Sequence, residues 1–495
     1  MNGAGNSLRM VMASAACVLG VLAACSAAGG DQLLVGAACG DITPAGPVAL
    51  CGQFHLRIAR KVETPLAANV IALESRRAGK AVDAAVMVAC DLVYVPADVL
   101  AEVRRAVRKR APEIDPMKIV LSATHTHTAP VLLEGKYPVP KTGVMQVGEY
   151  RAFFADRVAE AIARAWKARK PGSVTWGLGH AVVAYNRRAT YAGGRAQMYG
   201  RTNTASFRGL EGYEDHDVNT LFFRDARGKL IAMAVNVSCP AQEVESRTAV
   251  NADFWHPVRQ ALRKQYGAEV CVLGWTGAAG DQSPHLMYRK AADERMRKLR
   301  GLTRVEEIAR RVVRAVDEAH QAVKNDRHAD VPLVHRVKTL RLPMRLVTEA
   351  EHAEAKAAVK RAADQIARDP RQAARAHRRM RWYQVTVDRF ERQKTEPKPT
   401  CAMELHVVRL GGAVVCTNAF ELFTDFGIRI KARSPATQTF VVQLAGAGTY
   451  LPTKRAVRGG HYSAVVHSSL VGPEGGQVLV DRTVDLINAV WKDAR

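Results

Sequence analysis

Short apolar runs alternate with segments of helical periodicity along most of the chain. The apolar runs predict buried strands at 84–90, 118–122, 173–184, 218–223, 230–237, 270–274, 404–410, 413–417 and 439–444. Apolar residues at three- and four-residue spacing predict helices at 150–169, 254–265, 421–432 and 480–492. Pro96 opens a further helix with Val99, Val103 and Val107 on one face. This alternation favours one α/β domain with a mixed-sheet core.

Two capping boxes mark the starts of other helices. Thr303 with Glu306 precedes a helix with a valine- and isoleucine-rich face. Thr348 with Glu351 precedes an Ala-rich helix that ends near Asp369.

The second of these helices belongs to a segment, 346–398, that departs from the strand–helix alternation. Residues 371–394 continue it as a helical stretch with eight Lys and Arg against two acidic residues. We therefore expect a basic helical hairpin inserted in the core. It could act as a lid, as a membrane-facing arm or as a solvated spacer.

The composition narrows the class of protein. Hydrophobic residues make up 48% and charged residues 24%, which is globular and excludes disorder over the bulk of the chain. No run of 18 apolar residues follows the N-terminus, which argues against a polytopic membrane protein. The 72 Lys and Arg against 47 Asp and Glu give a net charge of +25, which attracts polyanions such as nucleic acid, anionic lipid head groups or acidic polymers, or is simply a basic surface; together with a lipid anchor it would hold the protein against an anionic membrane surface. No nucleic-acid-binding motif accompanies this charge, so we expect no nucleic-acid partner.

The N-terminus indicates export. An apolar stretch after Arg9 leads to Leu22-Ala23-Ala24-Cys25, which has the form of a bacterial lipobox. We expect residues 1–24 to be a lipoprotein signal peptide and Cys25 to carry the lipid, anchoring the mature domain, 25–495, to the cell envelope or to an outer membrane where one exists. The alternative is an ordinary signal peptide with a chance cysteine.

Cysteine spacing gives no metal-site signature. Of the nine cysteines, Cys17 and Cys25 fall in the N-terminal segment, and seven remain with no CxxC pair. Several lie in apolar runs, so we expect buried free thiols there.

A pair of histidines leaves the end of a predicted strand. His125 and His127 lie in the run Ser122-Ala123-Thr124-His125-Thr126-His127-Thr128-Ala129-Pro130. In extended backbone, both rings would point to one face. Neutral imidazoles bind zinc or act as general acid and base, although a chance pair at this spacing is common.

Four other segments carry candidate chemistry, and each also has a structural explanation. Arg187 follows a predicted strand and could hold a carboxylate, a phosphate or an amide oxygen, or remain a solvated surface residue. The glycine-rich segment 274–285 could present backbone amides and the Ser283 hydroxyl to an oxyanion, or form a tight turn. Glu421 is expected in the first turn of a helix, where a carboxylate also serves as a cap. Tyr450 lies in a Gly-rich loop from which a phenol could reach a site or simply pack.

Together these segments resemble the catalytic domain of the neutral/alkaline non-lysosomal ceramidases. The resemblance rests on segments that occur in one order over about residues 33–490: Asp41-Ile42-Thr43-Pro44, Cys51-Gly52-Gln53, the HTHTAP run, Asn186-Arg187, 277–284 and Tyr450-Leu451-Pro452-Thr453. It is greatest to bacterial secreted members that lack the C-terminal immunoglobulin-like domain. It implies a zinc-dependent amidase that splits N-acylsphingosine into a fatty acid and a sphingoid base.

The resemblance also implies roles for individual residues. His125, Glu421 and Tyr450 would be zinc ligands, and His127 and Arg187 would contact the substrate and its developing oxyanion. Asp281 and Ser283, in the Gly-Asp-Gln-Ser-Pro segment, would lie at the active site.

The chain departs from the family at one ligand position. The family has a second zinc histidine after the strand that corresponds to 230–237, whereas residues 236–243 contain no histidine here. Cys239, Gln242, Glu243 or His256 could take its place. The departure supports an alternative function, in which a surface lipoprotein of the same fold binds a lipid or glycan, or hydrolyses a different amide or ester.

Overall fold

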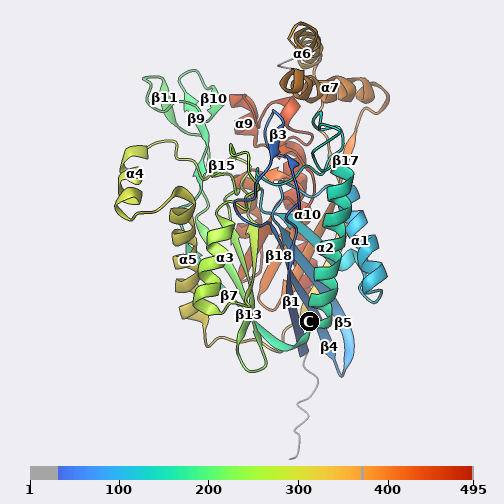
Figure 1. Cartoon of the computed structure of the whole chain (residues 1–495), viewed down its shortest axis with the longest axis vertical. Helices are drawn as coiled ribbons and strands as arrows, with labels where there is room; N and C mark the ends of the chain where they lie inside the picture. Colours follow the sequence, from blue (N-terminus) through green and yellow to red (C-terminus); the bar gives the residue numbers. More distant parts are fainter. Residues whose placement is uncertain (1–31, 370–372, 493–495) are drawn as a thin grey trace, which may run out of the picture.

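The strands are buried along most of their length because layers cover both faces of the sheets. The computed structural model describes residues 32–369 and 373–492, so the expected signal peptide and Cys25 lie outside the described residues. A mixed sheet of eight strands forms the centre of the molecule (Figure 1). Its order is β14 (Cys271–Thr276), β13 (Leu230–Val237), β12 (Asp217–Asp225), β7 (Lys170–His180), β1 (Gln32–Asp41), β4 (Ala67–Arg77), β5 (Lys80–Cys90) and β6 (Ile119–Ala123).

A narrow seam divides this sheet into two halves. β1 and β7 pair only through Leu34 with Pro171 and Val35 with Lys170, whereas β1 pairs with β4 along its whole length. The half-sheets β14-β13-β12-β7 and β1-β4-β5-β6 therefore share backbone pairing only at one end of β1, and beyond it β14 packs against β1, β4 and β5.

A second sheet packs against the first. It contains four strands in the order β16 (Leu333–Pro343), β17 (Thr400–Leu410), β18 (Ala413–Thr417) and β20 (Gln438–Val442). Apolar side chains of both sheets form the core between them, including Leu73, Met87, Phe223, Trp275, Val408 and Phe440. This arrangement is a face-to-face sheet packing.

Helices cover the outer faces of both sheets. The half-sheet that ends in β6 is covered by α1 (Ala97–Arg110) and α2 (Val147–Lys167), and the other half by α3 (Trp255–Tyr266) and α5 (Arg304–Val323). The small sheet is covered by α8 (Thr424–Arg433) and α10 (Pro473–Lys492). The result is a helix–sheet–sheet–helix sandwich, which confirms the predicted mixed-sheet α/β class. A further helix, α4 (Lys290–Leu299), projects beside α5 (Figure 1).

The predicted helical hairpin is confirmed. α6 (Glu349–Arg368) and α7 (Ala373–Thr395) extend from the end of the β16–β17 pair, whose last partners are Pro343 and Thr400. The hairpin forms the upper end of the molecule in Figure 1. Arg389 fixes α7 to the body by donating to the backbone oxygens of Val466, Ser469 and Arg345. Within the described residues, no helix has the length and apolar character needed to cross a membrane.

Short elements complete the described fold, and those of them that Figure 1 labels lie in its upper half, at the end of the molecule that carries the hairpin. They are β2 (Val48–Leu50), β3 (Arg57–Ala59), β8 (Tyr185–Asn186), β9 (Arg188–Tyr191), β10 (Ala196–Met198), β11 (Phe207–Leu210), β15 (Gln282–Ser283), β19 (Glu421–Leu422), β21 (Tyr450–Leu451), α9 (Lys454–Gly459) and the single turns η1 (Pro116–Lys118) and η3 (Val466–Ser468). Several of them carry the polar residues that the sequence singles out.

Two predicted helix starts are wrong. Glu421 lies in β19, because the backbone N–H groups of Glu421 and Phe423 donate to Thr449 and Leu451, and α8 begins only at Thr424. The last helix begins at Pro473, seven residues before the predicted start at Val480. It continues through Gly475 and Gly476 because their missing side chains admit close neighbours: a Cβ on Gly476 would lie 2.5 Å from Phe426 and Leu451.

Candidate functional site

The two histidines follow the end of β6, but their backbone is not extended. His125 has a φ of 67°, in the left-handed region, which contradicts the predicted strand geometry. The N–H groups of Thr124 and Thr126 donate to the carbonyls of Cys90 and Leu92, so the chain curls around the end of β5. The rings nevertheless meet, with centroids 4.8 Å apart and the two Nε2 atoms 3.4 Å apart.

Hydrogen bonds favour one tautomer for each ring. Nδ1 of His125 lies 2.7 Å from the Val93 carbonyl, which can only accept, so Nδ1 carries a proton. Nδ1 of His127 lies 3.1 Å from Glu245 Oε2, and its Nε2 is 2.7 Å from the Gln242 amide nitrogen. Because Arg187 donates to Gln242 Oε1, the amide NH₂ of Gln242 must face His127. In the neutral ring, the Nε2 of His127 is therefore an acceptor.

Electrostatics agree with a neutral His127. Burial lowers the pKa of His127 to about 4, against the opposing effect of Glu245. Burial alone would raise the pKa of Glu245, but the hydrogen bond and charge of His127 hold it at about 2. His127 and Glu245 form an oriented imidazole–carboxylate pair at neutral pH.

The β19–β21 pair places Glu421 directly opposite Tyr450. Glu421 Oε2 lies 3.4 Å from His125 Nε2 and 3.9 Å from Arg187 Nη2. Burial would raise the pKa of Glu421, but His125 and Arg187 lower it below its usual range. Burial raises the pKa of Tyr450 well above its usual value, so its phenol is protonated at neutral pH.

Arg187 connects these groups from the junction of β8 and β9. It is 2% exposed, and its guanidinium donates to Gly280 O at 2.9 Å, Gln242 Oε1 at 3.2 Å and Tyr450 Oη at 3.3 Å. Burial opposes its charge, but Tyr450, Tyr199 and Glu421 raise its pKa overall. A fully buried, fixed guanidinium beside two imidazoles and a carboxylate is an arrangement suited to an anionic centre.

Ser283 lies one side chain away from Arg187. Tyr199 bridges them: Arg187 donates to Tyr199 Oη at 3.3 Å, and Tyr199 donates to Ser283 Oγ at 3.0 Å. Ser283 also accepts from the backbone N–H of His285.

Asp281 lies apart from the cluster, because its carboxylate accepts from Thr424 and from Asn186 Nδ2. Its backbone oxygen accepts the Arg187 N–H, so Asp281 holds β8 and α8 together around the site.

Of the four residues considered for the missing ligand position, Gln242 contacts the cluster. Cys239 Sγ donates to the Val183 carbonyl at 3.3 Å, and burial raises its pKa well above the usual value. Glu243 pairs with Arg304 at 2.9 Å. His256 lies on α3 in the field of Arg259 and Asp91. Gln242 reaches His127 and Arg187, but with an amide that favours hydrogen bonding over zinc binding.

The three residues expected to hold zinc, His125, Glu421 and Tyr450, lie in one cluster. Across residues 32–369 and 373–492, no group of three or more His, Cys, Asp or Glu side chains could hold a metal ion. The cluster instead combines His125 and Glu421 with a phenol, Tyr450. The Val93 carbonyl fixes His125 with Nε2 turned towards Glu421, as outer partners do in metal sites. His125 and Glu421 are ligand types common in catalytic zinc sites, whereas a phenol is a less usual third donor.

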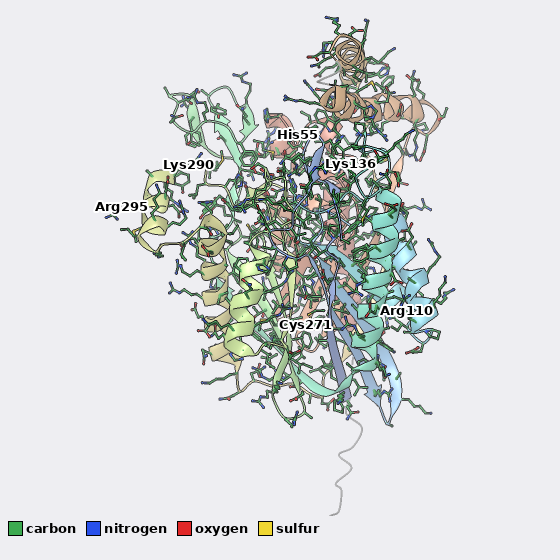
Figure 2. All side chains as sticks on the ribbon, viewed as in Figure 1. His55, Arg110, Lys136, Cys271, Lys290 and Arg295 are labelled. Carbon is green, nitrogen blue, oxygen red and sulfur yellow. The ribbon has the colours of Figure 1, made fainter. Side chains whose placement is uncertain are left out.

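Sequence reasoning missed Glu245, Tyr199 and an aromatic wall. Tyr462 packs on Tyr450 with ring centroids 5.5 Å apart. Two further rings pack on Tyr462: that of Phe54 with a centroid distance of 5.7 Å, and that of Trp382, from α7, with a centroid distance of 6.0 Å. The hairpin thus reaches the site through Trp382. His55 and Lys136 lie at this end of the molecule, below the hairpin (Figure 2). Residues this far apart in the sequence carry no local signal of contact.

Comparisons with known proteins support the fold. No protein-family model matches the sequence, and no curated protein matches it. Among solved structures, the chain is similar to a neutral ceramidase from Pseudomonas aeruginosa, with 16% identity and a TM-score of 0.66 over 92% of this chain and 75% of that one. A structure described as ceramidase complexed with C2 is similar at 16% identity and TM-score 0.66, over 93% and 76% of the two chains. The chain therefore has a neutral ceramidase-like fold.

Proposed function

We propose that this chain is an amide hydrolase that cleaves N-acylsphingosine-type lipids into a fatty acid and a sphingoid base. The observation that carries the proposal is the buried cluster of His125, His127, Arg187, Glu421 and Tyr450. Burying so many polar groups without a ligand costs free energy, and packing does not require them. The fold is that of structures described as ceramidases, which supports the same chemistry.

Each residue has a role in amide cleavage. His127, oriented by Glu245, accepts a proton from the attacking water at Nε2 after the water displaces the Gln242 amide. The water oxygen bonds to the carbonyl carbon, and the carbonyl oxygen becomes an oxyanion. Arg187 stabilises that oxyanion with its N–H groups. His127 then passes the proton to the nitrogen, and the C–N bond breaks.

Zinc would be held by His125, Glu421 and Tyr450. When bound, it would polarise the carbonyl and lower the pKa of the attacking water. Zinc binding would leave three neighbouring side chains free for the substrate. These are Arg187, His127 and Gln242, which lie in the same cluster and would not be zinc ligands.

The lipid chain has a place against the aromatic wall. Phe54, Trp382 and Tyr462 present apolar rings next to Tyr450, and Arg378 of α7 lies 5.2 Å over the Phe54 ring. An aromatic wall with basic residues beside it suits a lipid delivered from an anionic membrane surface. Anchoring at Cys25 would hold the chain at the cell envelope.

The test is fatty-acid release from N-acylsphingosine by zinc-supplemented protein. We expect His127→Gln to lower kcat at least 100-fold, because an amide cannot accept the proton at that position. His180→Gln is the matched control, since His180 is exposed on β7 and should leave kcat unchanged. Equal rates for both variants would contradict the proposal.

The amide at Gln242 supports a second candidate function. If the lost histidine has disabled catalysis, the protein would bind a lipid or glycan with the same cluster. Saturable binding of N-acylsphingosine without product release, in zinc-supplemented protein, would favour that function.

A further inference from the structure

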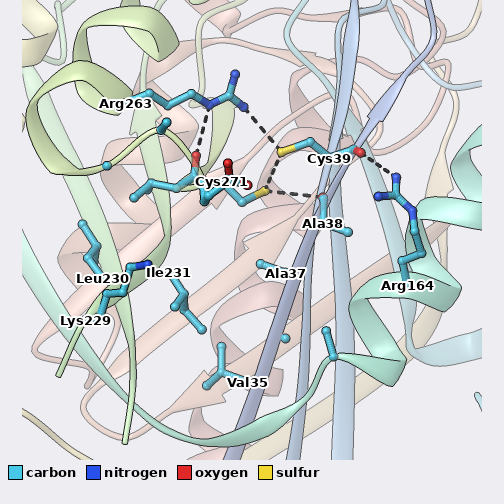
Figure 3. A pocket seen from close by; sticks show the side chains of 16 residues that line it. Val35, Ala37, Ala38, Cys39, Arg164, Lys229, Leu230, Ile231, Arg263 and Cys271 are labelled. Atoms are coloured by element: carbon cyan, nitrogen blue, oxygen red, sulfur yellow. Dashed lines mark hydrogen bonds between the residues drawn. The ribbon is translucent and has the colours of Figure 1, made fainter. Parts of the chain in front are cut away.

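Two cysteines face each other where β14 packs against β1, beyond the β1–β7 pairing. Cys39 lies near the end of β1, and Cys271 is the first residue of β14, 232 positions later in the chain. Their sulfur atoms are 3.4 Å apart (Figure 3). Cys271 lies in the lower half of the molecule, whereas His55 and Lys136 lie near the hairpin (Figure 2). The pair is therefore separate from the proposed hydrolase site.

We propose that Cys39 and Cys271 form a reversible disulfide, made by exchange with a small anionic disulfide that enters the adjoining cavity. This inference does not depend on the proposed hydrolase function.

The two sulfurs have different surroundings, and these give Cys39 and Cys271 different roles in the exchange. Arg263 Nη2 lies 3.4 Å from Cys39 Sγ, and Cys39 is half-buried, so a reagent can reach it. The hydrogen bond with Cys271 lowers the pKa of Cys39 to about 6, against burial and with help from Arg263 and Arg259. Cys271 is buried, and its pKa is raised well above the usual value. Cys39 is thus the nucleophile and Cys271 the second thiol.

A cavity beside Cys39 admits the reagent. It has a volume of about 730 Å³ and lies between β1, the start of β13, and the C-terminal ends of α2 and α3 (Figure 3). Its charged lining comprises Arg164, Lys229 and Arg263 against a single carboxylate, Glu269. Three cations against one anion favour a disulfide compound that carries carboxylates.

The exchange balances in two steps. The Cys39 thiolate attacks the small disulfide RSSR, forming a Cys39–SR bond and releasing RS⁻. Cys271 loses its proton, attacks the Cys39 sulfur and releases the second RS⁻, which leaves the Cys39–Cys271 bond. The protein is oxidised by two electrons, and RSSR is reduced to two thiols.

The cross-link would strengthen the weakest part of the sheet. β1 and β7 share two residue pairs at the seam, and a Cys39–Cys271 bond would tie β1 to β14 beyond it. A bond that closes so long a loop constrains the unfolded chain, so oxidation should raise Tm by about 2–4 °C in a protein of this size.

The test uses the folded full chain, fully reduced and then freed of reductant. Oxidised glutathione is added, and proteolytic peptides are mapped by mass spectrometry without reduction. We expect a cross-linked peptide pair containing Cys39 and Cys271. Cystamine, a cationic disulfide, should react several-fold more slowly at low salt, and the difference should shrink in 1 M NaCl. Both thiols remaining free in the folded wild-type protein, or cystamine reacting as fast as glutathione, would overturn the proposal.

Variants separate the two steps. Cys271→Ser should trap one glutathione adduct on Cys39, whereas Cys39→Ser should give no adduct on Cys271. Cys401→Ser is the control, because Cys401 is half-buried on β17 and its removal should leave the cross-link unchanged. A cross-link that instead joins Cys401 to Cys39 would contradict the assignment.

Discussion

At the residue scale, the proposed chemistry depends on how Arg187 is held. The guanidinium of Arg187 is fixed by a backbone carbonyl, an amide and two phenols, and it lies 3.9 Å from Glu421. A planar fork with several fixed donors cannot be reproduced by a single ammonium group. The sequence indicated Arg187 as a candidate, but its partners Tyr199 and Gln242 come from distant segments. Only the three-dimensional structure reveals why this arginine is buried.

Arg187→Lys should lower kcat on N-acylsphingosine by about 100-fold, equivalent to about 2.7 kcal/mol of transition-state stabilisation. KM should change little, since the lost donors act mainly on the oxyanion. Steady-state kinetics measures both values. Arg429→Lys, on the surface of α8 beside Gln477, is the matched control and should match wild type. A rise in KM with unchanged kcat would assign Arg187 to substrate binding instead.

The proposed zinc ligands give a second prediction at this scale. Elemental mass spectrometry should find about one zinc per chain in wild-type protein. His125→Ala and Glu421→Gln should each lose most of it, because two remaining donors hold zinc weakly. His256→Ala should retain it, since His256 lies beside Arg259 on α3. Equal zinc in all four proteins would contradict the assignment.

At the scale of elements, the spacing of apolar residues predicted the strands and helices that depend only on residues close together in the sequence. The capping boxes at Thr303 and Thr348 start α5 and α6 as expected. The failure at Glu421 has a physical cause: β19 forms by pairing with Tyr450–Leu451, about 30 residues later, and no helical or strand pattern within 421–432 encodes that partner. The same applies to His125, whose positive φ depends on backbone contacts with Cys90 and Leu92 through its neighbours.

Helix α7 yields a prediction about substrate length. Trp382→Ala removes the ring that packs on Phe54 and Tyr462. The ratio of kcat/KM for a long-chain to an N-acetyl substrate should fall about 10-fold, because only the long chain reaches this wall. Val385→Ala is the control on the same helix, since Val385 is 48% exposed. An unchanged ratio would place the acyl chain elsewhere.

At the scale of the whole molecule, a buried histidine pair lies between the β5–β6 side of the large sheet and the small sheet. His335 Nε2 is 3.0 Å from His406 Nδ1, and His335 Nδ1 is 3.1 Å from the Ala84 carbonyl. Burial lowers the pKa of both imidazoles, that of His335 well below its ordinary value of 6.5. Burial therefore favours a neutral His335, whereas His406 lies 2.7 Å from Glu404 Oε1, which opposes the effect of burial on His406.

Folding stability should consequently fall with acid. Above pH 6.5 both folded and unfolded chains hold the His335 ring neutral, and below it the unfolded chain binds a proton that the folded ring resists. The His335 ring costs about 1.4 kcal/mol of folding stability per pH unit below 6.5, down to its folded pKa. Chemical denaturation from pH 7.5 to 4.5 measures the slope. His335→Gln should flatten it, whereas exposed His180→Gln should not; identical slopes would refute the assignment.

The central claim is that the buried cluster hydrolyses the amide bond of an N-acylsphingosine. The most direct measurement quantifies fatty acid and sphingoid base released by purified zinc-supplemented protein, using mass spectrometry. The account predicts equal amounts of both products and at least a 100-fold loss of rate in Glu421→Gln, whose amide removes the carboxylate facing His125. Absence of both products from wild-type protein, or an unchanged rate in the variant, would contradict it.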